Sequence, residues 1–85
     1  MPASDMPDAE PMRADEQAMA YAAAERRRAQ FERRLAAVLR EWAEVEDGAD
    51  HRKALLARAE RHEQAAEHHD RAARHQEEAA DRMEG

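Results

Sequence analysis

Apolar residues recur every three or four positions along the first half of the chain. A repeat that averages 3.5 residues is typical of a helix face that packs in a coiled coil. No glycine or proline interrupts residues 12–46, which predicts one long helix over that range. The apolar repeat consists of Tyr21, Phe31, Leu35, Val38, Trp42 and Val45.

The second half of the chain repeats in sevens, with alanine in place of large side chains. Residues 60–80 read ERHEQAA, EHHDRAA and RHQEEAA, and each unit closes on an alanine pair. Residues 51–83 also lack glycine and proline, which predicts a second long helix. The 3.5-residue spacing links Leu55, Ala59, His62, Ala66, His69 and Ala73 along one of its faces.

The two predicted helices are joined by a short turn at residues 47–50, with the sequence DGAD. Gly48 can adopt the left-handed conformation that ends a helix, and Asp50 can cap the next helix. Helices of nearly equal length, about 50 Å each, that are joined by so short a turn fold back on each other. The predicted fold class is therefore all-α, an antiparallel two-helix hairpin over residues 11–84. Residues 1–10, with two prolines and three acids, are expected to be a flexible acidic tail.

The hairpin predicts a seam in which bulky residues of the first helix meet small residues of the second. Interdigitated helices pack large side chains against small ones, and the alanines of the second helix would provide the gaps. The predicted seam core comprises Tyr21, Phe31, Leu35, Val38, Trp42, Val45, Leu55, Ala59, Ala66 and Ala73.

A second face is predicted to mediate self-association into a dimeric four-helix bundle. Ala22, Ala29, Ala36 and Ala43 form another seven-residue repeat, although alanine could also be there only because it favours helices. Arginines that lack an acid three or four residues away can pair with a second copy. The predicted association face comprises Leu39, Leu56, Arg26, Arg27, Arg33 and Arg34.

Composition supports self-association and disfavours several partners. Of the 42% hydrophobic residues, 22 are alanine, so one chain can bury only a thin core. The net charge of −6 disfavours nucleic acid and anionic membranes, although residues 26–34 could bind nucleic acid weakly and without specificity. No apolar run could span a bilayer and no signal peptide is evident, so a cytoplasmic location is expected.

The five histidines raise the possibility of metal binding or pH sensing. Neither H-E-x-x-H nor Glu-x-x-His occurs, so any metal site would have to form between helices or subunits. Its candidate ligands are His62, His69, Glu32 and Glu63. Because imidazole ordinarily changes charge near about pH 6.5, a seam that contains His62 and His69 is expected to loosen in acid.

Catalysis is not expected from these residues. The chain has no cysteine and no threonine, and its only serine is Ser4, so nucleophiles are nearly absent and no cofactor is predicted. The sequence favours a non-enzymatic interaction, adaptor or regulatory module that acts as a homo-oligomer and docks another protein. The alternatives are a metal- or pH-responsive protein that uses inter-subunit His and Glu groups, or a weak nucleic-acid binder.

Overall fold

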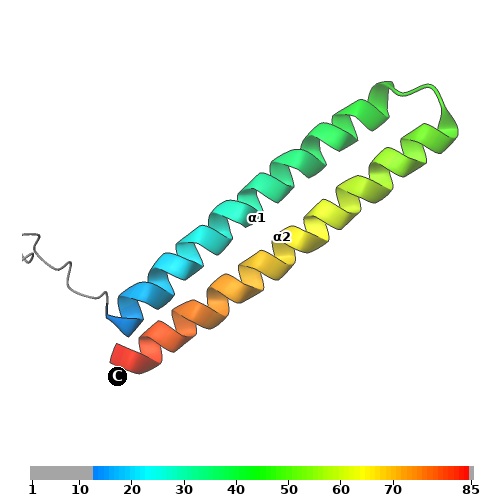
Figure 1. Cartoon of the computed structure of the whole chain (residues 1–85). Coiled ribbons are helices and arrows are strands. Elements are labelled where there is room, and N and C mark those ends of the chain that lie inside the picture. The colour runs from blue at the N-terminus through cyan, green and yellow to red at the C-terminus, as the bar shows by residue number, and fades with distance from the viewer. Residues whose placement is uncertain (1–12, 85) are drawn as a thin grey trace, which may run out of the picture.

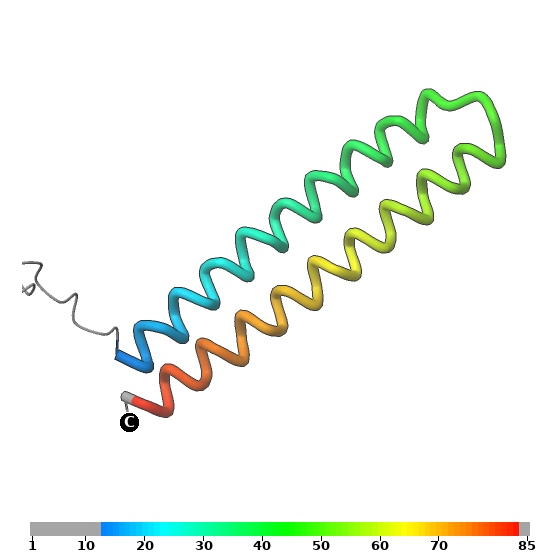
Figure 2. Tube along the Cα trace, viewed as in Figure 1, coloured from blue at the N-terminus to red at the C-terminus, as the bar shows by residue number. Residues whose placement is uncertain are grey.

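The computed structural model describes residues 13–84, which form two long α-helices lying side by side (Figure 1). Helix α1 spans Ala14–Val45 and helix α2 spans Ala49–Glu84. The chain reverses at residues 46–48, so the helices run antiparallel, and the start of α1 lies beside the end of α2 (Figure 2). The all-α hairpin is thus confirmed for these residues, whereas the expected tail at residues 1–10 lies outside them.

The turn forms one residue earlier than expected and without a left-handed glycine. Glu46 leaves the helix in an extended conformation, with φ −83° and ψ 123°, and no glycine of the described residues has a positive φ. The Glu46 carboxylate accepts a hydrogen bond from the Gly48 N–H at 3.0 Å, and the Arg52 guanidinium donates to the Glu46 carbonyl at 2.8 Å. Asp50 lies in the first turn of α2, where its charge complements the helix dipole.

The two helices meet along faces that are made mostly of alanine. We call this contact the alanine seam. Small side chains let helices approach closely, and each seam alanine is at most 5% exposed. Leu39 packs with Ala36 and Ala59 at the loop end, and Leu55 lies against them. The seam alanines are Ala18, Ala22, Ala29, Ala36 and Ala43 of α1 and Ala59, Ala66, Ala73 and Ala80 of α2.

The predicted seam core is wrong for α1, because this helix is turned by one sequence position, or about 100°. Tyr21, Phe31, Val38, Trp42 and Val45 are between 41% and 79% exposed. Leu35 is only half-buried. On α2, the predicted positions Ala59, Ala66 and Ala73 are 0% exposed, but they meet the alanine face of α1 rather than its bulky face.

Charge pairs across the helices accompany this rotation. Three arginines spaced by seven residues in α1 each reach an acid of α2. Turning Phe31 into the seam would instead bring Arg28 towards His69 and Glu32 towards Glu63. Each surface ion pair is worth at most about 1 kcal/mol, less than the burial of one large apolar side chain, so the pairs mark the register of the helices rather than cause it. The pairs are Arg26 with Glu77, Arg33 with Asp70, and Arg40 with Glu63.

Candidate interaction surface

The bulky residues of α1 form a stripe on the outside of the hairpin. Its members recur at steps of three and four residues, which keeps them on one side of the helix. Trp42 is 56% exposed and Phe31 is 57% exposed, so large apolar areas face water. We call this surface the apolar stripe: Tyr21, Ala24, Phe31, Leu35, Val38, Trp42 and Val45, with Arg28 in the intervening position.

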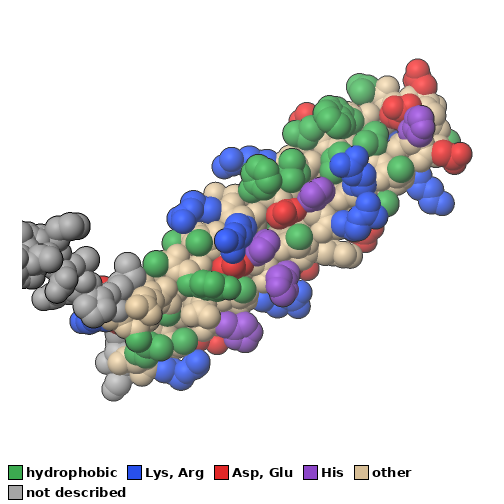
Figure 3. Space-filling view, viewed as in Figure 1, with side chains coloured by type: hydrophobic (Ala, Val, Ile, Leu, Met, Phe, Trp, Pro, Cys, Tyr) green, Lys and Arg blue, Asp and Glu red, His purple; other side chains and the backbone are tan. Residues whose placement is uncertain are grey.

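The apolar stripe is widest near the loop. In Figure 3, hydrophobic side chains gather along the loop half of α1, and histidines lie beside them over α2. The half of the stripe nearer the start of α1 holds only Tyr21 and Ala24 besides Arg28. Most of the large apolar side chains of the stripe therefore lie between Phe31 and Val45.

A buried carboxylate lies beside the stripe, at the edge of the alanine seam. Glu25 is 4% exposed, and its Oε2 lies 2.5 Å from His69 Nδ1, while its Oε1 accepts a hydrogen bond from Arg28 at 2.8 Å. The hydrogen bond from His69 lowers the pKa of Glu25, and Arg28 adds to this effect, against the raising effect of burial. Glu25 therefore stays ionised, and it neutralises the one charged member of the stripe.

A second histidine–glutamate pair lies one heptad closer to the loop. His62 Nδ1 is 2.5 Å from Glu32 Oε2, and since a carboxylate only accepts, the Nδ1–H must donate. Both histidines thus face carboxylates rather than Arg28. The expectation that the seam loosens in acid stays a prediction.

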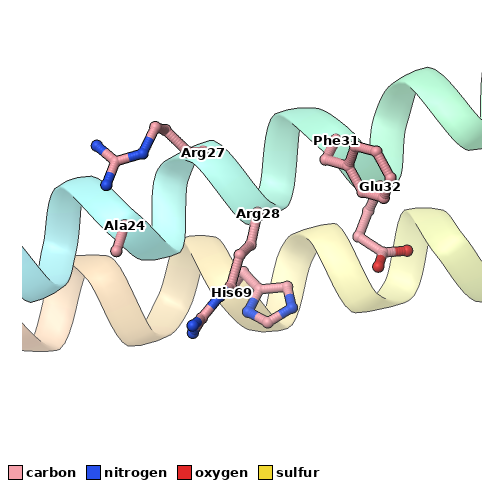
Figure 4. A pocket seen from close by; sticks show the side chains of 6 residues that line it. All are labelled: Ala24, Arg27, Arg28, Phe31, Glu32 and His69. Carbon is pink, nitrogen blue, oxygen red and sulfur yellow. The ribbon is translucent and has the colours of Figure 1, made fainter.

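A shallow hollow of about 400 Å³ opens between these polar groups and the stripe. It is lined by Ala24, Phe31 and Arg28 of α1 and by His69 of α2, among others. In Figure 4, Glu32 points towards α2 and Arg27 points away from it. The hollow is open to solvent, and the side chains that line it include no serine, threonine or cysteine.

The metal-ligand candidates fall into separate pairs. His62 binds Glu32, His69 binds Glu25, and Glu63 lies on the opposite flank with Arg40. Within residues 13–84, no group of three or more His, Cys, Asp or Glu side chains is placed to hold a metal ion. Among these candidates, a single hairpin therefore offers no more than two neighbouring ligand side chains at any one place.

The predicted association face is divided by the structure. Leu39 is 5% exposed and belongs to the alanine seam, whereas Leu56 is 39% exposed. The prediction is therefore wrong for Leu39, and Arg26 and Arg33 bind acids of α2 within the same chain. Arg27 and Arg34 remain exposed and make no ion pair among the described residues.

Two features of this surface were missed by reasoning from the sequence. The burial of Glu25 was not predicted, although this residue lies in the same heptad series as Ala22 and Ala29. The arginine–acid pairs across the helices were also missed. The signal for both was the matching alanine period of the two helices, which aligns Arg33 with Asp70 once the alanine faces are joined.

Neither helix in the part of the chain that the structure describes has an apolar stretch long enough to cross a bilayer. Comparisons with protein-family models, with curated proteins and with solved structures give no match for this chain.

Proposed function

We propose that this chain is a non-enzymatic helical interaction module that acts as a homo-oligomer, with the apolar stripe as its docking face. One observation carries the proposal. The chain has a single tyrosine, a single phenylalanine and a single tryptophan, and all three lie on the stripe with at least half of their surface exposed. Aromatic residues are enriched at protein interfaces and dominate binding energies there.

The thinness of the alanine seam supports self-association. A methyl group contributes little apolar area, and within residues 13–84 the large apolar side chains of the seam cluster are Leu39 and Leu55. Covering Phe31, Val38 and Trp42 with a partner would add the burial that the lone hairpin lacks. Two hairpins that meet through their stripes make a four-helix bundle, and its outer surfaces would remain for docking another protein.

Sedimentation equilibrium tests the proposal over a concentration series from below one micromolar to several hundred micromolar. We expect the mass to rise from that of one chain, 9.7 kDa, to twice that value, equally in EDTA and in added zinc. A mass of one chain at every concentration would contradict the homo-oligomer.

The His62–Glu32 and His69–Glu25 pairs favour one alternative, a metal-responsive oligomer. Both pairs lie at the edge of the stripe, so a dimer could bring a pair from each copy together and offer four ligands, as zinc prefers. In the same experiment this alternative predicts a doubled mass with zinc and the mass of one chain with EDTA.

A further inference from the structure

We infer that the apolar stripe docks antiparallel onto the stripe of a second copy, with the two loops at opposite ends and Arg34 of each copy beside Glu41 of the other. This inference rests on the proposed function and names its partner and geometry. It follows from two independent features of α1, which are the order of its large side chains and the position of its unpaired charges.

The order of the apolar side chains fits an antiparallel pairing centred between Leu35 and Val38. In an antiparallel coiled coil, the two alternating core positions face each other across the seam. Leu35 then meets Val38 of the second copy, and Phe31 meets Trp42. Since both pairs occur twice about the twofold axis, four consecutive layers are apolar. These are the bulkiest consecutive positions of the stripe.

The charges that flank the stripe fit the same register. Arg34 and Glu41 are exposed, and neither makes an ion pair among the described residues. They are seven residues apart on the same edge of α1, the edge away from α2. With Leu35 opposite Val38, this edge places Arg34 beside Glu41 of the second copy, twice per dimer. Charges at such flanking positions determine orientation and register.

A parallel pairing of the two stripes is disfavoured. It would put Arg28 against Arg28 and Trp42 against Trp42 of the second copy, because equal positions then face each other. The antiparallel register sets Arg28 near Val45 instead, where the ion pair with Glu25 compensates its charge.

A face-to-face bundle with both loops at the same end is disfavoured too. In that arrangement α1 lies over α2 of the second copy. At matched heights, Leu35 would meet His68 and Trp42 would meet Arg61. Large apolar groups gain most when their partners are also apolar, so stripe against stripe is favoured. Ala65 and Ala72 lie three residues after His62 and His69. Their small side chains leave room on the adjoining face of α2 for the second copy to pack against the stripe.

Charge reversal tests the register without touching the alanine seam. In Arg34→Glu, and separately in Glu41→Arg, both flanking pairs become like charges. We expect each variant to raise the dimer dissociation constant by about 5- to 30-fold, the effect of two exposed pairs reversed. An equimolar mixture of the two variants restores both pairs in the heterodimer and should return the constant to that of the unaltered chain. Arg27→Glu, on the same edge one heptad away, is the matched control and should not be rescued by Glu41→Arg.

The outcomes separate the geometry from the function. If the unaltered chain dimerises but the mixture associates no more tightly than either variant alone, the antiparallel register is wrong and the homo-oligomer stands. If Arg27→Glu is the variant that Glu41→Arg rescues, the stripes pair one heptad away, which also overturns the register. If the unaltered chain stays monomeric, the proposed function itself fails.

Discussion

Replacing Leu39 with alanine is expected to destabilise the hairpin by about 2–5 kcal/mol. Leu39 is 5% exposed and packs with Ala36, Ala59 and Leu55. The surrounding alanines cannot expand to fill the space that it leaves, so the cavity persists. A loss of this size is comparable with the whole stability of a small domain. Urea denaturation followed by circular dichroism at low temperature measures it.

Leu56→Ala is the matched control for this change. The two leucines were predicted to share one association face, but Leu56 is 39% exposed on the flank of α2. Its truncation removes less buried area and should cost no more than about 1 kcal/mol. Equal losses for both variants would contradict the placement of Leu39 in the alanine seam.

Replacing both Phe31 and Val38 with glutamate is expected to abolish the dimer while leaving the hairpin helical. Both side chains face solvent within one chain, at 57% and 41% exposure, so the alanine seam is unaffected. In the dimer, each copy would bury two carboxylates among apolar groups, a cost of several kcal/mol. We expect the dissociation constant to rise by more than about 100-fold, as measured by sedimentation equilibrium.

The control for this variant carries the same two charges at the same spacing. Gln30→Glu with Ala37→Glu shifts both substitutions by one position, onto exposed sites outside the stripe. This control should keep the mass of the unaltered chain. Loss of helicity in Phe31→Glu/Val38→Glu, with the control intact, would show that the stripe belongs to the hairpin core.

The two helices and their antiparallel order could be predicted from the sequence. Long runs without glycine or proline favour uninterrupted helices, and the one glycine between the two runs is Gly48. The bounds differ from those predicted by a few residues, since Glu46 already leaves α1 and Ala49 already begins α2. The positions of helix-breaking residues determine where the two helices begin and end, so a single sequence suffices to predict the helices and their order.

The rotation of α1 could not be predicted from apolar spacing alone. Two heptad series run through this helix one residue apart, the bulky series of Phe31 and Trp42 and the small series of Ala29 and Ala36. The large side chains of the first series gain more from burial than alanine does, so this series was predicted to lie in the seam. Cross-helix pairs such as Arg33 with Asp70 distinguish the two registers, and they become apparent only when the two helices are placed side by side.

The candidate surface was predicted in part, with its two faces exchanged. A second packing face beyond the hairpin seam was expected, and the structure leaves one uncovered. The bulky series, expected inside, lies on that outer face, whereas Leu39, expected outside, lies inside. Exchanging the faces keeps the argument for a bundle but changes which residues should form it.

The emission of Trp42 on dilution tests most directly whether the bulky face of α1 lies outside the hairpin. Trp42 is the only tryptophan, so its spectrum reports the stripe alone, while circular dichroism follows helicity in parallel. We expect long-wavelength emission, typical of a water-exposed indole, from dilute helical monomers, and a shift to shorter wavelength as the mass doubles. Short-wavelength emission from dilute helical monomers, unchanged by concentration, would place Trp42 inside the hairpin and contradict this account.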